Sequence, residues 1–86
     1  MMVAVRRLEL EYHHAARMGD RLTVESWVEK IGRTSVQVGQ NLKRGDGALL
    51  CEASVIGVFV SPAFRPIPVP DELRAAFPDD ALGRPA

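Results

Sequence analysis

The chain has 86 residues, of which 47% are hydrophobic and 26% are charged; this composition is typical of one small globular domain and not of a disordered segment. Its 11 basic residues balance its 11 acidic residues, so the charge gives no support for binding to nucleic acid or to an anionic membrane. The single cysteine, Cys51, excludes an intrachain disulfide and a cysteine-based zinc cluster.

The distribution of apolar residues indicates a cytoplasmic protein. No apolar run approaches the roughly 20 residues that cross a bilayer. Arginine follows the first five residues, which argues against a signal peptide. We therefore expect a cytoplasmic location, with neither a membrane nor a nucleic acid as partner.

Four segments carry apolar residues at alternate positions, the period of a half-buried strand. We predict strands over about residues 3–14, 21–31, 34–45 and 48–61. The fourth segment is apolar at both parities, which favours a central place between the first and third strands. The Asp46-Gly47 pair before it is typical of a tight hairpin turn.

The residues after Ser61 end the sheet. Prolines in "PAFRPIPVP" cannot donate to a ladder, and "PDELRAAF" predicts a short helix after Pro70. We predict one domain over residues 1–77, with residues 78–86 as a frayed tail. The fold class is α+β, mainly antiparallel β: a four-stranded curved sheet with a short C-terminal helix.

The predicted sheet has an apolar face that no predicted helix is long enough to cover. An exposed face of that size favours aggregation. We therefore expect cover from another copy of the chain, a partner or a further segment. An exposed strand edge is also a template for pairing. The sequence predicts a homo-oligomer, at minimum a dimer.

An ordered set of short motifs runs along the chain. It comprises Tyr12, Ala16-Arg17 and Gly19-Asp20, then Ile31, Gly32 and Ser35, then the segment from Arg65 to Pro70. In this order and spacing the chain, over about residues 3–77, resembles the hot-dog fold acyl-CoA thioesterases of the hydroxybenzoyl-CoA thioesterase type. The resemblance implies a partial hot-dog fold, an acyl-CoA thioester as ligand and no cofactor.

The resemblance also implies roles for particular residues. It places Arg33, Ser35 and Arg65 in coenzyme A binding, since arginine binds phosphate groups in a bidentate fork. It places Tyr12 and His14 on the acyl-CoA pocket. The family's catalytic carboxylate lies in a strand and helix that precede the matched region. We therefore assign no catalytic residue, and expect the 86 residues alone to hydrolyse acyl-CoA poorly or not at all.

Other candidate residues have structural explanations. His13 and His14 are adjacent on a strand and point to opposite faces, so we predict no metal site. Asp20 is expected to bond its own backbone in a bend, and Cys51 to be a small buried residue. A buried acid needs a partner, and we expect Glu52 to pair with Lys43 or Arg44 across the hairpin.

Two functional classes stay open at this point. The first is an acyl-CoA thioesterase that hydrolyses or binds its thioester. The alternative is a non-catalytic hot-dog remnant that acts as a binding or oligomerisation module, or a gene product with a misassigned start. An unrelated β-sheet binding module is weaker, because it would not explain the order of the motifs.

Overall fold

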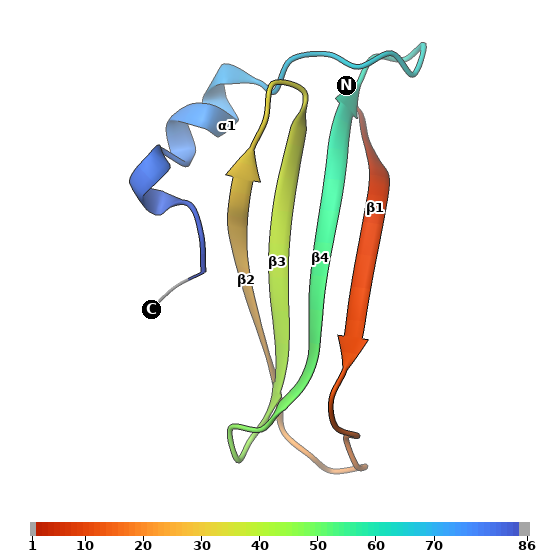
Figure 1. The fold of residues 1–86 in the computed structure, drawn as a ribbon, viewed down its shortest axis with the longest axis vertical. Helices are drawn as coiled ribbons and strands as arrows, with labels where there is room; N and C mark the ends of the chain where they lie inside the picture. Colours follow the sequence, from red (N-terminus) through yellow and green to blue (C-terminus); the bar gives the residue numbers. More distant parts are fainter. Residues whose placement is uncertain (1, 85–86) are drawn as a thin grey trace.

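A computed structural model describes residues 2–84 and contains one antiparallel sheet (Figure 1). Its strands are β1 (Met2–Tyr12), β2 (Leu22–Ile31), β3 (Ser35–Arg44) and β4 (Leu49–Val60), in the order β1-β4-β3-β2. A helix α1 (Asp71–Ala76) and a 3-10 turn η1 (Asp79–Ala81) follow. The predicted central place of β4 is confirmed, and every predicted strand boundary lies within two residues of the observed one.

The register of the strands sorts the side chains onto two faces. One row of cross-strand partners is apolar in all four strands: Leu8, Val55, Val38 and Val28. A row on the opposite face is polar throughout: Glu11, Glu52, Asn41 and Glu25. Because successive side chains point to opposite faces, the sheet has one apolar face and one polar face.

The apolar face is open to solvent along both outer strands. On β1, Val5 is 67% exposed and Leu8 is 62% exposed; on β2, Val24 is 62% exposed. The fully buried apolar residues lie instead on β4 and in the segment after it, among them Leu50 and Val69. The predicted uncovered face is therefore present in the part of the chain that the structure describes.

The chain after β4 folds back against the end of the sheet that carries the β2–β3 turn. The Val69 amide donates to the carbonyl of Arg33 at 2.8 Å, and the Val69 side chain is only 2% exposed. The Arg74 guanidinium of α1 donates to the carbonyl of Gly32 at 2.6 Å. These contacts fix α1, predicted from "PDELRAAF", beside the turn (Figure 1).

Residues 78–84 lie along β2, so the predicted frayed tail is wrong for this part of the chain. The Gly83 amide donates to the carbonyl of Val28 at 2.9 Å. The Arg84 guanidinium lies 5.6 Å from the centroid of the Trp27 ring, a cation–π distance. Local sequence pattern does not reveal this docking, because its two contacts depend on the tertiary position of Trp27 and Val28. No helix within residues 2–84 is long and apolar enough to span a membrane.

The predicted hairpin between β3 and β4 is confirmed. Gly47 adopts a φ of +89°, the left-handed region that glycine enters without a steric penalty. Asp46 closes the turn through an ion pair with Arg44 at 2.9 Å. The hydrogen bond from Arg44, and next that from the Ala48 amide, lower the pKa of the Asp46 carboxyl to about 2.

Gly39 is required by the ring that covers it. A Cβ atom at this position would lie 2.4–2.6 Å from three ring atoms of Trp27, its cross-strand partner. The indole therefore lies directly on the backbone of β3, on the polar face. Its N–H donates to the carboxylate of Glu29. Glycine in a strand interior often marks such a close approach.

We expect Gly39→Ala to displace the Trp27 ring and to destabilise the fold by about 1–3 kcal/mol, the usual cost of overpacking. Trp27 is the single tryptophan, so its fluorescence spectrum and the urea unfolding midpoint report the two effects. Gly45→Ala is the matched control, since its Cβ would meet Arg21 at an ordinary 3.6 Å. Unchanged fluorescence in Gly39→Ala would contradict the packing described.

Candidate functional site

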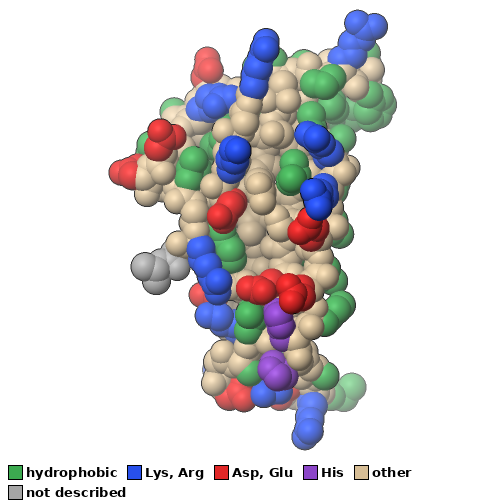
Figure 2. Space-filling view, in the orientation of Figure 1, with side chains coloured by type: hydrophobic (Ala, Val, Ile, Leu, Met, Phe, Trp, Pro, Cys, Tyr) green, Lys and Arg blue, Asp and Glu red, His purple; other side chains and the backbone are tan. Residues whose placement is uncertain are grey.

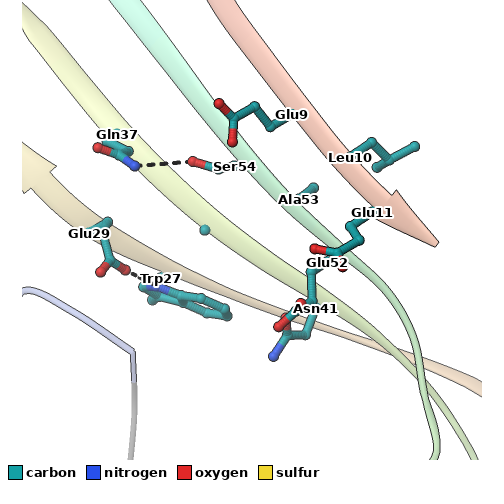
Figure 3. A pocket seen from close by; sticks show the side chains of 11 residues that line it. Glu9, Leu10, Glu11, Trp27, Glu29, Gln37, Asn41, Glu52, Ala53 and Ser54 are labelled. Carbon is teal, nitrogen blue, oxygen red and sulfur yellow. Dashed lines mark hydrogen bonds between the residues drawn. The ribbon is translucent and has the colours of Figure 1, made fainter. Parts of the chain in front are cut away.

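The polar face contains a cavity of about 480 Å³ over the middle of the sheet (Figure 3). Side chains from all four strands line it. Its ionisable residues are all acids, and the sole tryptophan lies at its side. The lining includes Glu9, Glu11, Glu29, Glu52, Trp27 and Asn41. The cavity therefore favours a cationic occupant over an anionic one.

Most carboxylates around this cavity already have a partner. Glu9 pairs with Arg7, and Glu29 accepts the indole N–H of Trp27. Glu25, one row member further along, pairs with Lys43 at 2.9 Å, and this contact lowers the pKa of the Glu25 carboxyl. Glu11 differs, because no ion pair or side-chain hydrogen bond joins it to another described residue.

Glu52 pairs with His13, so the predicted partners Lys43 and Arg44 are wrong. The Nε2 atom of His13 lies 3.1 Å from Oε2 of Glu52. A register shift between Leu42 and Lys43 pairs Lys43 with Leu49 and moves it away from Glu52. Lys43 binds Glu25 instead, and Arg44 binds Asp46. The prediction that Glu52 has a structural partner is confirmed, with a different residue in that role.

A second hollow, of about 270 Å³, lies nearer the β2–β3 turn and is basic. Its lining includes Arg6, Arg7, Lys30 and Ser35. In Figure 2, blue side chains gather over this end of the sheet, and red and purple ones gather over the other. The polar face is therefore basic toward one end and acidic toward the other.

Two strand irregularities produce the basic hollow. The register shifts between Val5 and Arg7 on β1, and between Val28 and Lys30 on β2. Both shifts fall at one level, because Arg7 and Lys30 join the same cross-strand row through Ile56 and Gln37. A bulge re-aims the side chains next to it. Arg6, Arg7 and Lys30 thus line one hollow, which strict alternation along the sequence did not predict.

The predicted coenzyme A residues lie at the same end of the sheet as the basic hollow. Ser35 lines that hollow at the start of β3. Arg33 is exposed in the β2–β3 turn, and its carbonyl is held by Val69. Arg65 is exposed in the segment after β4, where its amide donates to the Ser61 hydroxyl at 3.4 Å. This end of the sheet therefore has an arginine-bearing rim.

The predicted pocket residues lie at the other end. Tyr12 ends β1 and is 78% exposed, and His14 follows it, also exposed. A strand of ten residues is about 33 Å long, so Tyr12 and Arg33 stand about one strand length apart. Within one chain the structure does not bring the two predicted groups together.

The bend after β1 has the structural role expected for Asp20. The Asp20 carboxylate accepts the Arg17 amide at 2.7 Å, and the Asp20 amide donates back to the Arg17 carbonyl at 3.0 Å. Cys51 is buried, as predicted. The segment that contains both histidines is therefore mainly a bend.

Comparison with known proteins assigns the family. The model of the thioesterase superfamily matches residues 1–51. The acyl-CoA thioester hydrolase YbgC of Escherichia coli O6:H1 is 31% identical over 74 residues, which cover 85% of this chain and 55% of that protein. The chain belongs to the thioesterase superfamily. It spans about half the length of the curated relatives it matches.

Solved structures agree on the fold of this thioesterase-superfamily chain. A predicted thioesterase from Bacillus stearothermophilus has a TM-score of 0.85 at 24% identity, covering 98% of this chain and 62% of that one. A thioesterase from Thermus thermophilus, complexed with coenzyme A and Zn, has a TM-score of 0.78 at 23% identity, covering 85% and 57%. The predicted partial hot-dog fold is confirmed.

Proposed function

We propose that this chain forms the sheet of a cytoplasmic acyl-CoA thioesterase and binds acyl-CoA as a homodimer. Membership of the thioesterase superfamily is the observation that carries the proposal. The coenzyme A named for the Thermus structure supports the same ligand. The remaining support is physical and comes from the two faces and two ends of the sheet.

The sheet matches the two chemical halves of an acyl-CoA. The acyl group is apolar, and the exposed apolar side chains of β1 and β2, such as Leu8 and Val24, offer it a surface. Coenzyme A carries a 3′-phosphate and a pyrophosphate, and Arg33 and Arg65 stand exposed at one end of the sheet. Arginine suits phosphate groups because its guanidinium forms two parallel hydrogen bonds. We place the nucleotide head on this rim, with Ser35 beside it.

A dimer through the β1 edge would unite the two predicted residue groups. The outer edge of β2 is occupied by Gly83, whereas β1 has one neighbouring strand in the described part of the chain. Antiparallel pairing of two β1 strands around a two-fold axis sets the ends of the copies in opposite directions. Tyr12 and His14 of one copy then approach the arginine-bearing rim of the other.

We expect Arg33→Gln and Arg65→Gln each to weaken coenzyme A binding about tenfold, the loss expected for one charge-assisted hydrogen bond. Isothermal titration calorimetry of coenzyme A into the full chain measures this. Arg17→Gln is the control, since Arg17 lies exposed in the bend at the opposite end of the sheet. Equal affinities for all three variants and the unmodified chain would contradict the placement of the head group.

We expect the chain to sediment as a dimer at micromolar concentration and Leu10→Pro to produce a monomer. The His13 amide donates to the Leu50 carbonyl at 2.8 Å. In an antiparallel ladder every second amide therefore faces β4, and that of Leu10 faces the open edge. Proline removes this outward donor and no bond to β4.

Leu10→Ala is the control for the dimer test, because it shortens the side chain and keeps the N–H group. It should stay dimeric. Far-UV circular dichroism verifies that Leu10→Pro keeps its sheet. A monomeric unmodified chain, or a folded Leu10→Pro that stays dimeric, would refute pairing through β1.

A further inference from the structure

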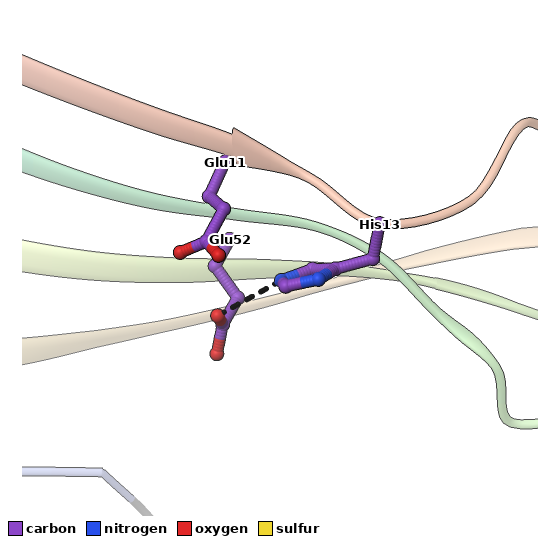
Figure 4. A group of neighbouring side chains, drawn as sticks. All are labelled: Glu11, His13 and Glu52. Carbon is purple, nitrogen blue, oxygen red and sulfur yellow. Dashed lines mark hydrogen bonds and ion pairs between the residues drawn. The ribbon is translucent and has the colours of Figure 1, made fainter.

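Three metal-ligating side chains converge at the acidic end of the polar face. They are Glu11, His13 and Glu52, and one ligand atom of each lies within 4.8 Å of the others (Figure 4). Glu11 and His13 project from consecutive same-face positions of the β1 segment, and Glu52 is the β4 residue directly opposite Glu11. These three residues, referred to below as the Glu-His-Glu cluster, lie at the border of the acidic cavity.

The geometry of the cluster is close to that of a bound ion. Zinc binds imidazole nitrogen and carboxylate oxygen at about 2.0–2.2 Å. Ligands at such distances in a tetrahedron are separated from one another by about 3.4 Å. His13 and Glu52 already approach to 3.1 Å. Closing the third edge from 4.8 Å requires only rotation of the Glu11 side chain, which is exposed.

The charges of the cluster favour a cation. Glu11 and Glu52 are direct cross-strand partners, and like charges in that position destabilise a sheet. His13 binds the Glu52 carboxylate, while Glu11 has no ion-pair partner within residues 2–84. A divalent ion between the carboxylates would remove the repulsion and supply the partner that Glu11 lacks.

The backbone holds the imidazole in place. The amides of His13 and His14 both donate to the carbonyl of Leu50, at 2.8 and 3.3 Å. This carbonyl belongs to the buried end of β4, close to Glu52 in the chain. The His13 and Glu52 ligands are therefore attached to strand ends that are fixed relative to each other, which preserves the site before an ion arrives.

We propose that the Glu-His-Glu cluster is a binding site for a divalent transition-metal ion, with zinc as the best-suited common ion. An imidazole ligand favours zinc over magnesium or calcium, which prefer oxygen alone. Three protein ligands leave a fourth tetrahedral position for water. That position opens toward solvent on the polar face, so the site is separate from the apolar face assigned to the acyl group.

The test is calorimetric titration of zinc chloride into the full chain after chelator treatment and buffer exchange. We expect one zinc ion per chain, and no saturable binding of magnesium at the same concentration. His13→Gln, Glu11→Gln and Glu52→Gln should each weaken zinc binding at least about tenfold, since even the partners of ligands contribute that much.

Two controls separate a built site from nonspecific binding. His14→Gln changes the adjacent exposed histidine, and Glu9→Gln changes a nearby carboxylate that pairs with Arg7; both should bind zinc within about twofold of the unmodified chain, far less than the loss of a ligand. Equal losses in His14→Gln and His13→Gln would overturn the proposal. So would undiminished binding in Glu11→Gln.

A measurement on the unmodified chain keeps the proposal falsifiable if a variant misfolds. Manganese broadens the NMR signals of nearby nuclei and should bleach the amides around Glu11, His13 and Glu52 first. Bleaching centred elsewhere, or no saturable zinc binding at about 1 mM, the weak limit of specific affinity, would overturn the site.

Discussion

β4 pairs with β1 on one side and with β3 on the other, in registers that align residues of like character across the sheet. Through this strand the apolar row of Leu8 and Val55 and the polar row of Glu11 and Glu52 are continuous from edge to edge. A shift of one residue in either pairing would turn one strand over and mix the faces. Both the acyl surface and the acidic cavity therefore depend on this register.

The two faces suit different ligands. The apolar face offers a broad surface without ionisable groups in its central row, as the acyl part of a thioester requires. The polar face is divided by the paired bulges, with Arg6, Arg7 and Lys30 toward one end and the Glu-His-Glu cluster toward the other. A thioester with its phosphorylated head and a metal ion would thus occupy separate parts of one small sheet.

Period-two alternation was sufficient to predict the strands, the central place of β4 and the open apolar face, because each depends on local pattern. The contacts of the polar face were not predictable in this way. The partner of Glu52 depends on a register shift at Lys43, and the convergence of Glu11 and His13 with Glu52 depends on which strand lies opposite. The docking of Gly83 and Arg84 on β2 likewise needs the folded sheet. Adjacent His13 and His14 drew attention to each other, whereas the true neighbours were two and thirty-nine residues away.

The central claim is that the apolar face holds the acyl group while the arginine-bearing rim holds the nucleotide head. Backbone amide NMR spectra recorded during titration with coenzyme A, and then with acyl-CoAs of increasing chain length, test it directly. The account predicts that both ligands shift the amides near Arg33, Ser35 and Arg65, and that only acyl-CoAs shift those of Leu8, Leu10 and Tyr12, increasingly with chain length. Shifts that ignore chain length, or that centre on the row of Glu11 and Glu52, would contradict it.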